Sequence, residues 1–276
     1  MIPNASTRRL LAWAPLLLGA LVSLLPIAMM ALNAFKSHAE IARAPLALPT
    51  TLKFDNFATA WTSGTFGVGF VNSAILAAST IFIVLVLAAP ASYALSRSRS
   101  VFARLSLLYF LAATTVPIQM FLFPLFFAYA KLGMIGNVVA TSLILAALNL
   151  PLSILLLRSY VNAIPSDIDD AAQIDGASSC RTFLFVILPM MRPGLFVVSV
   201  IVGLNAWNEF LVTSTFQQGE GAFTMTLGYL SMNGVFFTNQ GAMMAGGFIV
   251  VAPVMILFLF LQRYFVAGIA AGAIKE

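Results

Sequence analysis

The sequence predicts an all-α membrane protein with six transmembrane helices, and three observations support this fold class. Hydrophobic residues make up 61% of the 276 residues and charged residues only 8%, too few charges to coat a soluble globule. Uncharged stretches long enough to cross a bilayer recur along the chain. The lysines and arginines gather in alternate loops, as expected where positive charge sets the orientation of a multi-pass protein.

The first three spans follow from the first three uncharged runs. Residues 10–35 carry no charge and are longer than the apolar core of a signal peptide, so we expect an uncleaved first helix. Residues 36–66 are mixed and are expected to form an external loop. The second span covers about 70–95, and the third covers about 105–130 with Pro117 near its middle.

The remaining spans complete a single predicted domain over residues 1–276. The fourth span covers about 138–157, the fifth about 194–213 and the sixth about 242–262. A polar loop, residues 158–193, separates the fourth span from the fifth.

The distribution of basic residues predicts the orientation. Six spans place both termini on one side of the membrane. That side holds ten of the fourteen lysines and arginines, and it includes the loop 158–193. The positive-inside rule therefore predicts that both termini and this loop are cytoplasmic.

The loop 158–193 contains a predicted short helix. It carries four of the nine carboxylates, at Asp167, Asp169, Asp170 and Asp175. Ser166 is expected to cap the helix, with Asp169 reaching back as in a capping box, and Gly176 is expected to end it. The helix should cover Asp167 to Asp175 and present one face with Ile168, Ala171, Ala172 and Asp175.

This helix is expected to dock into a groove of another protein. The small residues Ala171, Ala172 and Gly176 allow close approach, and Asp175 suits a basic group of the partner. The alternative is a helix that lies on the membrane surface without a partner. Its acidity argues against that alternative, because such helices are usually basic.

The sequence predicts no catalytic site. It lacks the Gly-x-x-x-x-Gly-Lys-Ser/Thr loop that cradles phosphates, and it lacks HExxH and GxSxG. One cysteine, Cys180, and one histidine, His38, are too few for a Cys/His metal cluster. We therefore expect a protein that is not an enzyme and holds no metal.

The loop resembles a known motif. Asp170-Ala171-Ala172 is followed by three residues, Gly176, nine residues and Val186-Ile187-Leu188-Pro189. This spacing resembles the EAA loop of the inner-membrane permease subunits of bacterial ABC importers, with Asp170 in place of Glu and Val186 in place of Ile. The segments DDAAQIDGA (169–177), AWNEF (206–210) and the tail 262–276 resemble the carbohydrate-uptake branch, which includes the maltose permease.

The resemblance implies partners and roles. It implies an ATPase contact at Asp170, Ala171, Ala172, Asp175, Gly176 and Ala177. It also implies a cytoplasmic ABC ATPase dimer that carries ATP and Mg, so that this chain needs no cofactor. A second permease subunit of different sequence, an extracytoplasmic solute-binding protein and a sugar-like substrate complete the expected assembly in the bacterial inner membrane. No nucleic acid is expected.

A second candidate site lies in the fifth predicted span. Glu209 is the only acid well inside a predicted span, and intramembrane ionisable residues are functional candidates. Asn205, Asn208 and Glu209 share one arc of a helix and would suit sugar hydroxyls. Two alternatives stay open: the arc packs against the sister subunit, or Glu209 lies in water at the outer boundary.

Two other functions fit the sequence less well than the importer permease. A secondary transporter or channel that works alone usually needs several ionisable residues at midplane, and it would leave the acidic loop unexplained. An intramembrane enzyme would need a catalytic motif that the sequence lacks.

Overall fold

The computed structural model describes residues 5–235 and 239–273, and every regular element in these ranges is helical. The predicted all-α class is therefore confirmed. The chain divides into two compact units: the first contains 1–67 and 228–256, and the second contains 68–227 and 257–276. The single domain expected over 1–276 stays a prediction. The end of the tail, 274–276, lies outside the described residues.

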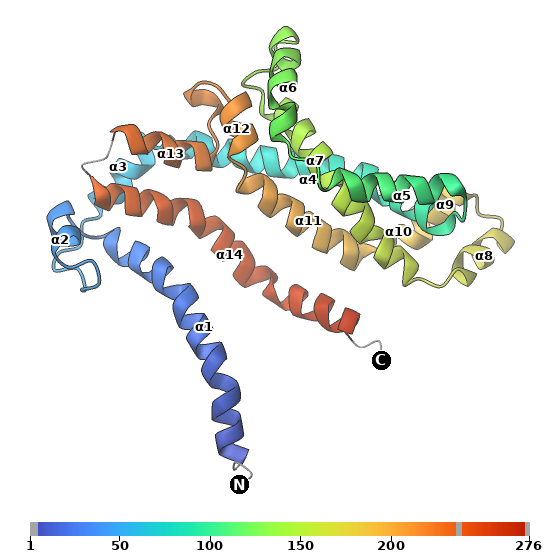
Figure 1. Ribbon diagram of the computed structural model, residues 1–276, viewed down its shortest axis with the longest axis horizontal. Helices are drawn as coiled ribbons and strands as arrows, with labels where there is room; N and C mark the ends of the chain where they lie inside the picture. The colour runs from blue at the N-terminus through green and yellow to red at the C-terminus, as the bar shows by residue number, and fades with distance from the viewer. Residues whose placement is uncertain (1–4, 236–238, 274–276) are drawn as a thin grey trace. The chain divides into compact units, whose positions relative to one another are not determined.

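The first unit holds two long apolar helices and a folded loop. Its elements are α1 (Ala5–Asn33), α2 (His38–Arg43), α3 (Asp55–Ser63), most of α13 (Met225–Val235) and the first half of α14 (Gln240–Ala273) (Figure 1). The apolar parts of α1 and α14, Trp13–Asn33 and Gln240–Phe260, are each long enough to cross a membrane. α14 continues to Ala273, beyond the predicted end of the sixth span at 262.

The predicted external loop 36–66 has a polar core of its own. The Lys36 side chain is fully buried, and its Nζ donates hydrogen bonds to the carbonyl oxygens of Ala44 and Pro45, both at 3.1 Å. The amide of Asn56 donates to the carbonyl oxygens of Ala34 at 2.8 Å and Lys36 at 2.9 Å. These bonds satisfy backbone carbonyls that no helix or strand would satisfy.

A carboxylate joins two segments in the first half of this loop. The Thr50 N–H donates to Glu40 Oε1 at 2.6 Å. This backbone hydrogen bond stabilises the charged form and lowers the pKa of Glu40 below 4.5.

The second unit carries both candidate sites. Its elements are α4 (Phe66–Arg97), α5 (Val101–Ala113), α6 (Gln119–Lys131), α7 (Val138–Asn162), α8 (Asp167–Ile174), α9 (Ser179–Thr182), a π-helical turn (Phe183–Ile187), α10 (Leu188–Met190), α11 (Arg192–Trp207), α12 (Leu211–Phe216) and a 3₁₀ turn (Glu220–Ala222). α7 packs against α5, α11 and α12. Figure 1 shows α8 beside α9.

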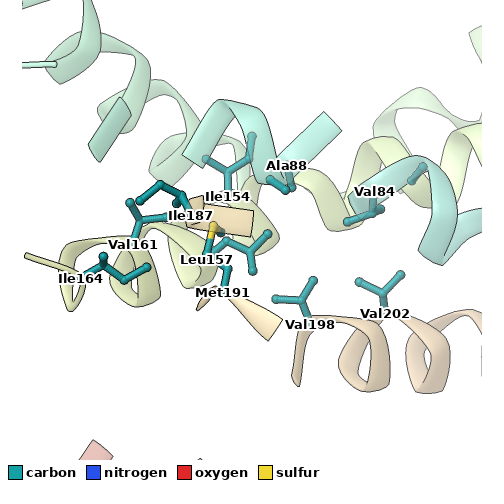
Figure 2. Close-up of a cluster of buried hydrophobic side chains, with 12 residues drawn as sticks. Val84, Ala88, Ile154, Leu157, Val161, Ile164, Ile187, Met191, Val198 and Val202 are labelled. Carbon is teal, nitrogen blue, oxygen red and sulfur yellow. The ribbon is translucent and has the colours of Figure 1, made fainter. Parts of the chain in front are cut away.

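The core of the second unit is built by α4, α7 and α11. Figure 2 shows Leu157 and Val161 of α7 near Ile187 and Met191, while Val84 lies on α4. Each of these five side chains is fully buried. This cluster holds the loop 158–193 against the ends of the long helices, because Ile164 and Ile187 belong to the loop itself.

Some of the predicted transmembrane spans appear as single long helices in the structure, and others are broken. Four described helices are long and apolar enough to cross a membrane, and a fifth candidate is the pair Ser179–Met190 and Arg192–Trp207, which is bent by 74°. The third predicted span, 105–130, is instead two helices, α5 and α6, of 13 residues each with a break at 114–118. Each is about 20 Å long, short of the ~30 Å hydrocarbon core. The count of six spans stays a prediction.

Proline accounts for the break between α5 and α6. Pro117 lacks the N–H that would continue the helix, and it disfavours helical geometry in the residue before it. The hydroxyls of Thr114 and Thr115 bond back to the carbonyl oxygens of Leu111 and Ala112. The carbonyls left free at the end of α5 thus gain local donors.

Candidate functional site

The acidic helix α8 ends at a glycine in the left-handed region, as the sequence predicted. Gly176 has φ +81°, which glycine adopts without a Cβ penalty. Its N–H donates to the Gln173 carbonyl at 3.0 Å, and the Ala177 N–H donates to the Ala172 carbonyl at 2.9 Å. This pair of bonds is the Schellman motif, which satisfies the last carbonyls of a helix. The end of α8 is therefore well defined.

The start of α8 differs from the prediction. Ser166 has helical backbone angles, φ −66° and ψ −23°, and its side chain makes no capping hydrogen bond. Asp169 does not reach back to it, so the predicted capping box is wrong. The Asp169 carboxylate instead accepts hydrogen bonds from the Tyr93 hydroxyl and the Arg97 guanidinium at the end of α4. Both groups are ionised in the Asp169–Arg97 contact, and contacts of this kind are among the strong hydrogen bonds of proteins.

Burial divides α8 into two sides. Ile168 is half-buried, and Asp169 and Ala172 are buried against the chain itself. Ala177, just beyond the helix, is half-buried. The exposed side carries four predicted contact residues, Asp170, Ala171, Asp175 and Gly176. The predicted single face is thus corrected, because Ala172 packs inward while Ala171 and Asp175 face outward.

The structure shows an exposed apolar residue on α8 that the sequence analysis did not single out. Ile174, the last residue of α8, is 87% exposed. Ile168 and Ala172, four positions apart, lie on the buried side of α8, and Ile174 does not fall on that side. A large apolar residue on the polar side of an acidic helix was the sequence signal that could have identified it. Covering an exposed aliphatic side chain of this kind with a partner protein is energetically favourable.

A groove runs beside the exposed side of α8. A cavity of about 400 Å³ is lined by Ala172, Asp175, Ala177, Arg181, Phe185 and Val186. It therefore gathers three of the six predicted contact residues with three that were not predicted as contacts, Arg181, Phe185 and Val186. Its lining includes one carboxylate and one guanidinium, and the other side chains are apolar.

A wide helical turn connects this groove to the next long helix. Residues Phe183–Ile187 form a π-helical turn, and the Leu188 N–H donates to the Phe183 carbonyl. Such turns arise where one extra residue is accommodated in a helix, and they occur frequently at functional sites. This turn ends at Ile187, two residues before Pro189, the last position of the EAA-like motif.

The second candidate site is a polar cavity in the same unit. Asn205, Asn208 and Glu209 line a cavity of about 340 Å³ together with Asn149 and three leucines, 145, 148 and 204. The Asn205 amide donates to Asn149 Oδ1 at 2.9 Å. The structure thus brings all three predicted residues together. Asn149 lies outside the predicted set, because a single amide in a span often serves only as an interhelical bond.

Glu209 lies at an interruption and not inside a continuous span. α11 ends at Trp207, α12 begins at Leu211, and the Glu209 carboxylate accepts the Val212 N–H at 2.7 Å. The predicted fifth span, 194–213, is therefore broken before its end. A carboxylate at the start of a helix satisfies an unpaired N–H and complements the positive end of the helix dipole.

Among the residues that the structure describes, no group of three or more His, Cys, Asp or Glu side chains could hold a metal ion. The single cysteine, Cys180, is free and exposed. The polar cavity therefore offers amide groups, one carboxylate and aliphatic walls for binding a solute.

Residues 86–271 match the protein family described as "Binding-protein-dependent transport system inner membrane component". The chain belongs to this family. The permease is 32% identical over 263 residues to the diacetylchitobiose uptake system permease protein NgcG of Streptomyces coelicolor, which covers 94% of this chain and 87% of that protein. It is 30% identical over 264 residues to the arabinooligosaccharides transport system permease protein AraQ of Halalkalibacterium halodurans, with 93% and 92% covered.

A solved structure shares the fold of the permease. A chain of a bacterial ABC transporter involved in the import of the acidic polysaccharide alginate matches it with a TM-score of 0.77 and 21% identity, covering 96% of this chain and 99% of that one. The predicted resemblance to ABC importer permeases is confirmed, and the chain is a multi-pass inner-membrane protein. The family match includes the whole loop 158–193 and the polar cavity. The roles of their individual residues stay predictions.

Proposed function

We propose that the permease forms half of the pathway for a sugar or sugar-like solute, and that α8 is the contact through which closure of an ATPase dimer drives alternating access. The exposed side of α8, with its well-defined end and adjoining groove, is the observation that carries this proposal. The relatives named for uptake of diacetylchitobiose and arabinooligosaccharides support the sugar class.

The chemistry of α8 suits a protein partner. Asp170, Ala171, Asp175 and Gly176 are exposed on one side, where small residues permit close approach and the carboxylates suit basic groups. Ala172 and Ala177 contribute through the groove beside the helix. Ile174 adds an apolar contact, and burying an isoleucine stabilises an interface by about 1.5–3 kcal/mol.

The energy source is assigned to a separate subunit. The sequence has no phosphate-binding loop of the Gly-x-x-x-x-Gly-Lys-Ser/Thr type. ATP and Mg are therefore placed on a partner ATPase dimer in the cytoplasm, with no cofactor in this chain. A second permease subunit of different sequence completes the pathway, and a solute-binding protein delivers the solute from outside. Both termini are placed in the cytoplasm, which the ten-to-four distribution of basic residues supports.

The polar cavity is proposed as part of the solute path. Its volume of about 340 Å³ lies within the range of small-molecule sites. Asn149, Asn205 and Asn208 offer amide donors and acceptors that match sugar hydroxyls, and Glu209 adds an acceptor. The leucine walls suit the apolar faces of a pyranose ring.

A cross-link tests the coupling role. In a Cys180→Ser background, Ala171→Cys should form an oxidant-induced disulfide with a cysteine introduced into the docking cleft of the co-purified ATPase, or a short thiol-to-amine cross-link with an ATPase lysine, and the yield should change with nucleotide. Lys131→Cys, at the end of α6, is the control and should give no product. An ATPase that co-purifies yet never cross-links to Ala171→Cys would refute the contact.

Uptake tests the solute path. Asn149→Leu and Asn205→Leu should raise the KM for uptake of labelled diacetylchitobiose or an arabinooligosaccharide, whichever the unaltered permease carries, at unchanged membrane abundance. Gln119→Leu, an amide that lines a different cavity, is the matched control. An unchanged KM in both cavity variants would contradict the assignment. Uptake without any ATPase would favour the alternative of a transporter that works alone.

A further inference from the structure

A buried ion pair joins the coupling loop to a helix far away in the sequence. Arg97 Nη2 lies 2.8 Å from Asp169 Oδ2, and Arg97 Nε donates to the same oxygen at 2.9 Å. The other carboxylate oxygen, Oδ1, accepts the Tyr93 hydroxyl at 2.6 Å. Both oxygens of Asp169 are therefore held by the last turn of α4. The Asp169 side chain is only 8% exposed and that of Arg97 22% exposed.

The same turn of α4 holds the segments on either side of α8. Arg97 Nη2 also donates to the Ile164 carbonyl at 3.1 Å, just before the helix. The Tyr93 ring stacks on Phe183 at 5.4 Å between centroids, just after it. The Ser96 hydroxyl, on the same turn, donates to Asn162 Oδ1. Four groups of the loop therefore meet one turn of α4: the Asn162 amide, the Ile164 carbonyl, the Asp169 carboxylate and the Phe183 ring.

This arrangement removes a rotation that the chain connections leave free. The chain connects α8 to its neighbours through residues 163–166 and 175–178, and Ile168 and Ala172 pack its inner side against the rest of the unit. Apolar packing is non-directional, so it fixes the rotation of a helix less sharply than a polar contact of defined geometry. An attachment of that kind away from the helix axis fixes the remaining angle. Asp169 supplies this attachment, because its side chain leaves the middle of α8 and ends on α4.

We propose that Arg97, Tyr93 and Asp169 form a clamp that makes α8 and the end of α4 move as one body. Asp169 is a positioning residue in this proposal, since it faces away from the exposed side that meets the ATPase. The inference rests on the proposed coupling function of α8 and deepens it. A force on α8 would then reach α4 directly, in addition to the flanking α7 and α11.

The clamp predicts a fixed distance. The experiment uses the full complex with its partner permease and ATPase in nanodiscs, in a Cys180→Ser background, with spin labels at Leu87→Cys on α4 and Gln173→Cys on α8. Both positions are exposed. The distance distribution should be narrow and should stay the same in the nucleotide-free and the ATP–vanadate-trapped states.

Two clamp variants and one control should separate the outcomes. Asp169→Asn should broaden the distribution at least twofold, and Tyr93→Phe, which removes only the hydroxyl, should broaden it less. Asp167→Asn removes an exposed carboxylate from the same helix, without a clamp contact, and should leave the distribution narrow. The two mild changes keep side-chain size and guard against a failure to fold.

A second readout reports coupling. Nucleotide trapping should change the maleimide accessibility of Asn208→Cys in the polar cavity, and Asp169→Asn should shrink this change several-fold while ATP hydrolysis continues. Two results would overturn the clamp. One is a distance between the two spin labels that shifts on nucleotide trapping while Tyr93, Arg97 and Asp169 are unaltered. The other is a narrow distance distribution in Asp169→Asn. Failure of the Ala171→Cys cross-link would instead overturn the coupling function, because the distance lies within one chain and does not depend on docking.

Discussion

Replacing Gly176 with valine should damage the end of α8 through backbone strain alone. Gly176 has φ +81°, and a Cβ placed there would meet no atom within 4 Å. A Cβ therefore fits the space, and backbone strain is the expected cost. The left-handed conformation costs an L-residue about 1–2 kcal/mol, and a β-branched residue there is an outlier.

This strain is large enough to open the last turn. A change of about 1–2 kcal/mol corresponds to a factor of roughly 5–30 in a two-state equilibrium. The two bonds of the Schellman motif, from Gly176 and Ala177, should therefore exchange their amide hydrogens roughly 5–30 times faster. Uptake should be lost with them, because a frayed helix end no longer transmits a push.

Hydrogen exchange on the purified complex, combined with uptake in cells, measures both effects. Gly176→Asn is the matched control, because asparagine tolerates the left-handed region and should keep most of the protection and the uptake. Equal protection in the valine variant and the unaltered permease would refute the strain argument. Loss of uptake with intact protection in the asparagine variant would instead show that a side chain at Gly176 blocks the partner.

Three further predictions concern the packing and the folded loop. Gly194→Ala would place a Cβ 2.6 Å from the Tyr160 ring, so the melting temperature in detergent should fall by the equivalent of about 1–3 kcal/mol, and a second change, Tyr160→Ala, should recover part of it. Lys36→Met leaves the part-buried carbonyls of Ala44 and Pro45 without their donor and should cost about 1–3 kcal/mol in total; an unchanged melting temperature would contradict this. The lowered pKa of Glu40 means that its bond to the Thr50 N–H stabilises the loop above pH 4.5 and is lost as the pH falls through the lowered value; Glu40→Gln should abolish the pH dependence of Thr50 amide protection, corrected for intrinsic exchange.

Local signals in the sequence predicted local structure well. The end of α8 followed from one glycine, because a left-handed residue at a helix end depends only on the neighbouring backbone. The arc of Asn205, Asn208 and Glu209 followed from helical spacing, and the structure brings these residues to one cavity. The resemblance of the EAA-like loop led to the right family.

Long-range partners could not be predicted in the same way. Asp169 was expected to cap its own helix, yet its partners lie 72 and 76 positions earlier in the chain. Nothing in the local pattern distinguishes a capping carboxylate from one that pairs with a distant guanidinium. The inward packing of Ala172 has the same cause, because burial depends on which side α4 and the loop approach.

Prolines show a second limit of sequence reasoning. Pro90, Pro151 and Pro253 lie inside continuous helices, whereas Pro117 lies at the break between α5 and α6. Each removes one backbone donor, and only the surrounding packing decides whether the helix continues. The third span was for this reason predicted as one helix.

The π-helical turn at Phe183–Ile187 lies within the motif, so the number of residues in the motif sets the directions in which the following side chains point. A residue in an α-helix advances about 100° around the axis, and a π turn absorbs one additional residue. Deleting one residue from the turn would convert it to an ordinary α-turn, and the residues on either side would keep their angular positions. Adding one more residue would instead rotate the residues that follow by about 100° and would turn Ile187 out of the buried core. The turn therefore makes the spacer tolerant of one missing residue and intolerant of an added one.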